Sequence, residues 1–435
     1  MAIFTGQDTG FTSRPLASSS ASAASALGFD ATTSPSERFL LFVTVMLLPL
    51  ENHIRIVPNV SSMFFIFVVL AGYVAINRLR CLDRVWMHSV FLAAYLFIGI
   101  TVALEFTSPL SMYGNIVTFA LMIVGALLVA SLCRDRAALK MLMFGYIGAA
   151  LWLGATLVLT SYGTLSGVVA TDYGGADQAR AEAFRDAPLE GNLNALAIHC
   201  AQGGVVALAF ALGSVVVRSR IIFTAIGIFC LVASSLFMSR GAIINLGISF
   251  AVLFKAYGVR QGKTWLLIGV LLAGAVLLVP DAIWLRMGLT TVGSHKDSRV
   301  SLYESAIQHV DDYWLTGVGA GNYFNKWGFE NGFAHCRKGS CVVYGVHNVF
   351  LQVMVNWGLV GLLAYIALVW LAYRCLPRVY NDPLALGILG IAVSLLLLMP
   401  FMHEFFYKGF SLGLGMLVAY QRWLAPSNAA QLSNR

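Results

Sequence analysis

The sequence has 435 residues, of which 59% are hydrophobic and 11% are charged, and its formal net charge is +8. Soluble domains carry about 25% charged residues, so this composition excludes a water-soluble globular protein and predicts a polytopic membrane protein. Most Lys and Arg residues lie in short links between apolar runs, as the positive-inside rule describes. We therefore expect the protein to reside in a lipid bilayer, and we do not expect its positive charge to bind nucleic acid.

Residues 1–36 are rich in Ser, Ala and Thr without an apolar period, which predicts a disordered cytoplasmic tail. Apolar runs long enough to cross a bilayer follow, and their pattern predicts an all-α polytopic protein of about twelve transmembrane helices. The predicted spans are residues 39–56, 60–76, 85–104, 112–132, 137–159, 192–217, 221–237, 242–255, 265–285, 347–373, 384–399 and 406–420.

The basic links follow every second predicted span, which predicts that both termini are cytoplasmic. The two long polar segments then become extracytoplasmic, and the larger one forms a helical loop domain. The expected organisation is a tail (1–36), nine spans (37–285) that include a first loop (161–190), a large loop (286–344), three spans (345–423) and a cytoplasmic tail (424–435).

Within the large loop, the run from Arg299 to Ile307 has the pattern of an amphipathic helix. Leu302, Ala306 and Val310 are spaced at four residues and are expected to share its apolar face. A Gly-rich turn follows at residues 314–321. Because no predicted strand precedes this turn, we reject a dinucleotide-binding fold.

Two of the seven cysteines, Cys336 and Cys341, lie in one polar loop, whereas the other five lie within or beside apolar runs. An extracytoplasmic loop favours a disulfide between them. Free thiols and a thiolate metal pair are the alternatives, although no second pair completes a four-ligand set. We expect no metal site.

His347 stands where a basic polar segment meets a long apolar run. The dipole at a helix N-terminus and the nearby Arg residues both disfavour the imidazolium and are expected to lower the pKa of His347. A neutral imidazole can act as a general base. The alternative is a capping or interfacial histidine, and His335 and His403 are rival candidates.

Arginines before two other predicted helices are candidate anion ligands. Arg185, with Arg180 close by, precedes Asn192 and Asn194, and Arg240 stands in a Ser-Arg-Gly turn. Helix N-termini favour anions. The alternatives are that Arg185 pairs with an adjacent acid, that the asparagines cap the helix, and that Arg240 reaches toward lipid headgroups.

Several of these features, taken in order, resemble the shared core of the O-antigen ligase and O-antigen polymerase family. The resemblance covers about residues 180–372 and rests on Asn192-x-Asn194, Ser239-Arg-Gly241, Arg299…Tyr303…Ala306, Leu315-Thr-Gly-Val-Gly-Ala-Gly321, His347-Asn348 and Asn356-Trp-Gly-Leu-Val-Gly361. One departure is Asn192-Leu-Asn194, where the family commonly has Asn-Pro-Asn.

This resemblance implies a GT-C type membrane glycosyltransferase whose donor is a glycan on undecaprenyl pyrophosphate and whose acceptor is a glycan or glycolipid. It implies that His347 is the catalytic base and that Arg185 and Arg240 hold the pyrophosphate, without a metal or cofactor. Arg180 and Arg299 are further anion-binding candidates, and Asn192, Asn194 and Asn348 are expected to support the site.

A ligase that transfers the glycan to a lipid A-core sugar is the leading interpretation, and a polymerase that joins repeat units is the alternative within the family. Either would act at the periplasmic face of a bacterial inner membrane. A twelve-span transporter would predict paired halves and ionisable residues near the midplane. Neither signal is evident in the sequence, so transport is the weaker hypothesis.

Overall fold

A computed structural model describes residues 32–50, 62–78, 82, 85–111, 113–167, 193–258, 298–337, 340–377, 382–401 and 408–424. The ninth predicted span, most of both tails, most of the first loop and the beginning of the large loop lie outside these residues. The end of the predicted N-terminal tail is described, and there Ser34 caps α2, which begins at Pro35.

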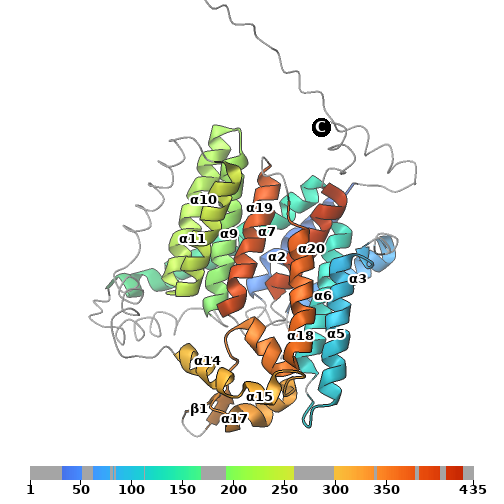
Figure 1. Ribbon diagram of the computed structural model, residues 1–435. Helices are drawn as coiled ribbons and strands as arrows, with labels where there is room; N and C mark the ends of the chain where they lie inside the picture. Colours follow the sequence, from blue (N-terminus) through green and yellow to red (C-terminus); the bar gives the residue numbers. More distant parts are fainter. Residues whose placement is uncertain are drawn as a thin grey trace, which may run out of the picture.

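The described chain is mainly helical (Figure 1). The helical bundle contains α2 (Pro35–Met46), η1 (Leu48–Leu50), α3 (Ser62–Asn77), α5 (Ser89–Phe106), α6 (Gly114–Leu132), α7 (Arg136–Gly167), α9 (Leu193–Gly213), α10 (Val217–Leu236), α11 (Arg240–Tyr257), α18 (Val349–Arg374), α19 (Pro383–Leu398), η4 (Met399–Phe401), α20 (Lys408–Ala419) and η5 (Tyr420–Leu424). The large loop contains α14 (Ser298–Gln308), α15 (Val310–Tyr313), α16 (Ala320–Asn322), η3 (Tyr323–Trp327), α17 (Gly328–Glu330), β1 (Ala334–Arg337) and β2 (Ser340–Val343).

Among the described residues, six helices are long and apolar enough to cross a membrane, namely α5, α6, α7, α9, α10 and α18. Helices satisfy their own backbone hydrogen bonds, which is the condition for lying in lipid. The protein is therefore an all-α multi-pass membrane protein. The count of twelve spans stays a prediction, since α3 and α19 are shorter apolar helices and α2 and α20 have 12 residues each.

Helix α9 lies at the centre of one half of the bundle, and most of its residues are buried. It packs against α7, α10, α11 and α19 (Figure 1). Small residues make this close packing possible: a Cβ on Gly203 would meet the backbone of Tyr146 on α7 at 2.7 Å. The other half contains α5, α6, α18 and α20.

Ion pairs join several helix ends at one end of the bundle. The buried Glu37 carboxylate on α2 bonds Arg78 at 2.7 Å and Arg134 at 3.1 Å, and Arg38 pairs with Asp135 at 3.0 Å. The loop elements α14, α15, α17 and β1 lie at the opposite end (Figure 1). The two ends thus differ in character, with fixed ion pairs at one and a folded loop at the other.

The loop has its own apolar core, built largely from aromatic side chains. Tyr313, Tyr323, Trp327 and Phe333 are buried and pack ring against ring, with the Trp327 and Phe333 centroids 5.5 Å apart. Such pairs add to the stabilisation from apolar burial. The loop therefore forms a packed subdomain, which we call the loop subdomain (residues 298–348).

The amphipathic helix predicted from Arg299 is present as α14, and Leu302 and Ala306 face the core. Val310 does not share that face, because the helix is interrupted at His309 and α15 begins at Val310, which is 36% exposed. The sequence pattern also gave no sign of the hairpin formed by β1 and β2. Its strands are short, and a local alternation signal is weak at that length.

Helix α18 is broken about a third of the way along its length, at Trp357 and Gly358. The Gly-rich turn of the loop docks into this break: Val318 N donates to Val355 O at 2.9 Å, and Gly319 N donates to the Asn356 carbonyl at 2.9 Å. Across the break, Leu359 N donates to the Trp314 carbonyl at 2.9 Å. The turn therefore satisfies backbone groups that the break frees.

Glycine is required where the two backbones approach each other. Gly317 and Gly358 have φ values of +77° and +62°. A Cβ at Gly317 would overlap the Asn356 carbonyl, and one at Gly358 would overlap the Leu315 carbonyl. The Gly-rich motif thus has a structural explanation in helix–loop docking.

Candidate active site

His347 precedes α18 by two residues and has φ +55°, a left-handed conformation that few non-glycine residues adopt. Its side chain is half-buried. The next residue, Asn348, caps the helix, and its Oδ1 accepts a hydrogen bond from Leu351 N at 3.1 Å. His347 therefore lies in an irregular turn just before α18, and the N-cap of that helix is Asn348.

Backbone contacts to the loop subdomain hold this turn. The Tyr303 hydroxyl donates to the His347 carbonyl at 3.1 Å, and the Tyr323 hydroxyl donates to the Tyr344 carbonyl at 2.7 Å. Burial raises the pKa of the Tyr323 hydroxyl, which keeps it a proton donor at neutral pH. Both ends of the segment that carries His347 are thus fixed by tyrosines.

Arg299 lies one helical turn before Tyr303 on α14. Residues four apart on a helix are neighbours on one face. Since the Tyr303 hydroxyl contacts the His347 backbone, the structure brings Arg299 to the same side of the loop subdomain as His347. Arg299 is half-buried.

Arg240 is the first residue of α11, and a chain of contacts relates its height in the bundle to that of His347. Asn245 Nδ2 donates to the Ser394 carbonyl of α19 at 2.6 Å, and α11 and α19 run antiparallel (Figure 1). Five residues correspond to about 7.5 Å along a helix. Five residues before Asn245 is Arg240 on α11, and five residues after Ser394 is Met399 on η4, so the two lie at a similar level of the bundle. The neighbouring Pro400 carbonyl accepts a hydrogen bond from Tyr303 at 3.4 Å.

These contacts bring Arg240, Arg299 and the His347 turn to the end of the bundle that carries the loop subdomain. Asn194 lies in the first turn of α9 and is half-buried. Arg180, Arg185 and Asn192 lie outside the described residues, so their relation to His347 stays a prediction. The rival histidine His403 also lies outside them.

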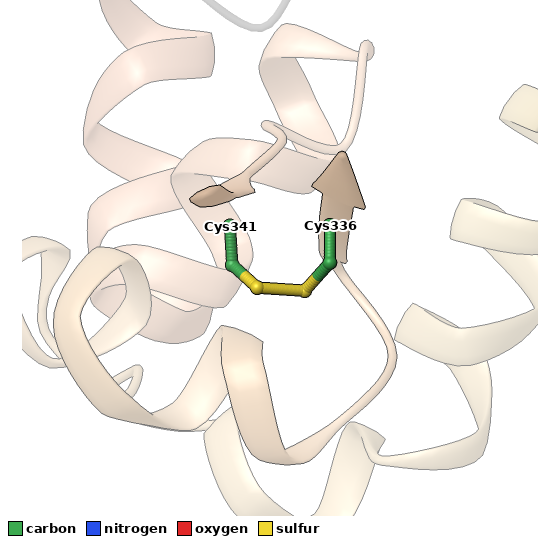
Figure 2. Close-up of a disulfide and its surroundings, with 2 residues drawn as sticks. All are labelled: Cys336 and Cys341. Carbon is green, nitrogen blue, oxygen red and sulfur yellow. A yellow bond between two sulfur atoms is a disulfide. The ribbon is translucent and has the colours of Figure 1, made fainter. Parts of the chain in front are cut away.

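The structure joins Cys336 and Cys341 in a disulfide (Figure 2). The two residues face each other in the register of β1 and β2, and their Cα atoms are 4.0 Å apart. The hairpin is followed directly by the His347 turn. The disulfide therefore closes the last element before the candidate base.

Three buried polar residues near the site were not among the predicted site residues: Glu105 on α5, and Gln352 and Asn356 on α18. They are 0%, 1% and 1% exposed. The signal that could have found them is a polar or acidic residue inside an otherwise apolar run, which is costly in a membrane unless it has a role. Within the described ranges, no three His, Cys, Asp or Glu side chains gather as a metal site would require.

The fold and these positions define an all-α multi-pass membrane protein with a histidine and two arginines at the end that carries a folded loop. Residues 222–366 match the sequence model of the O-antigen ligase family. This stretch is about a third of the chain and contains Arg240, Arg299, the Gly-rich turn, His347 and the break in α18.

Residues 222–366 thus match the O-antigen ligase domain, and this match supports the resemblance to the O-antigen ligase and polymerase family that the sequence motifs indicated. The match indicates a membrane glycosyltransferase-like ligase or polymerase of polysaccharide biosynthesis. No curated protein matches the chain.

Proposed function

We propose that the protein is a ligase-type glycosyltransferase of the bacterial inner membrane that acts at the periplasmic face. It moves a glycan from undecaprenyl pyrophosphate to a sugar hydroxyl of lipid A-core. The observation that carries this proposal is the left-handed His347 turn, held by Tyr303 at the end of the bundle where α11 begins with Arg240. Strained backbone conformations of this kind concentrate at functional sites.

In the proposed reaction, the neutral imidazole of His347 removes the proton from the acceptor hydroxyl. The acceptor oxygen then forms a bond to the anomeric carbon of the donor glycan. The bond from that carbon to the phosphate oxygen breaks, and undecaprenyl pyrophosphate leaves with the electron pair. The proton stays on His347 until it passes to solvent or to the leaving group.

The leaving pyrophosphate gains negative charge as this bond breaks. Arg240 and Arg299, with Arg185 or Arg180 from the first loop, would stabilise that charge, and each charge-assisted hydrogen bond is worth about 1.5–3 kcal/mol. Asn192, Asn194 and Asn348 would shape the helix ends around the donor. This chemistry requires no metal or cofactor, because the guanidinium groups supply the positive charge.

The decisive experiment is transfer by purified protein from a polyprenyl-pyrophosphate donor to a lipid A-core acceptor, in the presence of a chelator. His347→Ala is expected to abolish transfer with unchanged membrane insertion. His309→Ala is the matched control, since the His309 imidazole bonds the Ser305 carbonyl at 2.8 Å and packs on Trp327 inside the loop subdomain. Full activity of His347→Ala would refute the role of His347 as base.

A polymerase is the alternative that the family match equally supports. The two functions differ in what accumulates when the gene is deleted. Loss of a ligase should leave full-length glycan chains on the lipid carrier, whereas loss of a polymerase should leave single repeat units on the acceptor. Glycan profiles of a deletion strain therefore choose between them.

A further inference from the structure

We propose that Gln352, supported by Glu105, is a positioning residue that holds the backbone next to His347 and thereby sets where the imidazole stands. The inference rests on the proposed role of His347 as general base. It is carried by a continuous path of buried hydrogen bonds from α5, through the Gly-rich turn and the break in α18, to Val346.

The near end of this path is the Gln352 amide. Val346 N donates to Gln352 Oε1 at 2.8 Å, and Gln352 Nε2 donates to Asn356 Oδ1 at 3.0 Å. The orientations of both amides follow from donor and acceptor chemistry. A backbone N–H requires an oxygen opposite it, so Gln352 must present its nitrogen to Asn356, and Asn356 must present its oxygen in return.

The far end of the path is the Glu105 carboxylate. It accepts hydrogen bonds from Ala320 N and Gly321 N, both at 2.9 Å, and from Trp357 Nε1 at 3.3 Å. Glu105 is completely buried. A buried carboxylate is retained only where such donors compensate for its lost hydration, so its partners are held firmly.

The two ends meet at the break in α18. The Asn356 carbonyl accepts from Gly319 N at 2.9 Å while its side chain accepts from Gln352. Asn356 is thus bonded on one side to the turn that Glu105 holds, and on the other to the glutamine that holds Val346. The N-terminal half of α18, the Gly-rich turn and the His347 segment therefore form one hydrogen-bonded unit.

Positioning by this unit has a distinctive kinetic consequence. A displacement of about 1 Å in a catalytic group can lower the rate about 100-fold. The Gln352 side chain bonds the backbone of Val346 and the side chain of Asn356. Its loss should therefore lower kcat, while the KM values for donor and acceptor stay within about twofold. The pH dependence of kcat should stay unchanged, since His347 itself is not substituted.

Gln352→Met and Gln352→Glu are the test pair, because both keep the size of the side chain. Met removes both hydrogen bonds. Glu keeps an oxygen for Val346 N, and rotation of the Asn356 amide can restore the second bond. We expect a kcat loss of about 100-fold for Met and of less than about tenfold for Glu, and a loss in the same direction for Glu105→Gln. Gln202→Met, at a buried glutamine of α9, is the control that should keep its activity.

Hydrogen exchange of the full-length protein in lipid nanodiscs gives a readout independent of turnover. The peptide covering residues 344–348 should lose protection in Gln352→Met and keep it in Gln352→Glu. Unchanged protection in Gln352→Met, or lost protection with unchanged kcat, would overturn the inference. The proposed function is tested separately by His347→Ala. If His347 is not the base, this variant stays active even though Gln352→Met lowers the protection of the 344–348 peptide.

Discussion

The hydroxyl of Tyr303 and the carbonyl oxygen of His347 are joined by a hydrogen bond of 3.1 Å that spans 44 positions of sequence. The same hydroxyl lies 3.4 Å from the Pro400 carbonyl in η4, which follows α19. One side chain of the loop subdomain therefore ties the candidate base to the membrane helices. This link connects the packing of the loop to the geometry of the site.

Removal of that hydroxyl should impair transfer. Tyr303→Phe is expected to cost about 1 kcal/mol in stability, the usual net value of a hydrogen bond, and to lower the initial rate of transfer several-fold. Tyr313→Phe is the matched control, since its hydroxyl donates to the Ala306 carbonyl at 2.6 Å away from His347. Equal loss of activity in both variants would mean that general loosening of the subdomain, and not the His347 contact, sets the rate.

A lysine should not replace Arg240. An ammonium group is a point charge and lacks the planar pair of donors that binds phosphate in a bidentate manner. Arg240→Lys is expected to lower kcat/KM for the lipid-linked donor by at least about tenfold, which corresponds to the loss of about 1.4 kcal/mol. Arg218→Lys, in the first turn of α10, should retain normal activity.

Normal turnover of Arg240→Lys would indicate that Arg240 contacts lipid headgroups instead of the donor. Donor binding measured with a non-transferable analogue separates this outcome from a defect in folding, because a lipid-anchoring arginine would leave the affinity for the analogue unchanged.

The cysteines of the hairpin should be protected from thiol reagents. Both Cys336 and Cys341 are exposed, so as free thiols they would react at once with a membrane-impermeant maleimide. The disulfide predicts labelling only after reduction. The loop that it closes is short, and the chain-entropy relation gives a stabilisation of about 2 kcal/mol. A variant with both cysteines replaced by Ser should unfold at lower temperature, and prompt labelling without reductant would contradict the disulfide.

Acid should weaken the ion-paired end of the bundle. Burial alone would raise the pKa of Asp135, but hydrogen bonds from Ala138 N, Thr33 N and the Arg38 guanidinium lower it below its usual value. A lowered folded-state pKa means that this stabilisation is present above the unfolded pKa, near 3.8, and is lost as pH falls through the folded value.

Asp135→Asn should therefore reduce the unfolding temperature at neutral pH, by an amount that corresponds to about 1 kcal/mol, and the difference should shrink as pH falls below about 3.8. Asp311→Asn, at an exposed position of α15, should show no comparable difference. Thermal unfolding in lipid nanodiscs across this pH range measures both.

Much of this molecule is predictable from local sequence patterns. Uninterrupted apolar runs predict α5, α6, α7, α9, α10 and α18, because lipid leaves the backbone no alternative to a helix. The spacing of Leu302 and Ala306 predicts α14. The ordered motifs from Ser239 to Gly361 indicate the family, and His347 is conspicuous as a titratable group at the start of an apolar run.

Other features depend on contacts that no local pattern contains. Glu105 bonds Gly321 N across 216 positions of sequence, and only the folded chain reveals that the Gly-rich turn fills the break in α18. The helix-spaced apolar positions around Leu302 also suggested that Val310 is buried, whereas the interruption at His309 turns it outward. Hydropathy thus determined which segments form membrane helices, because it acts residue by residue. Tertiary structure decided how His347 is held, because that depends on backbone groups brought together from distant segments.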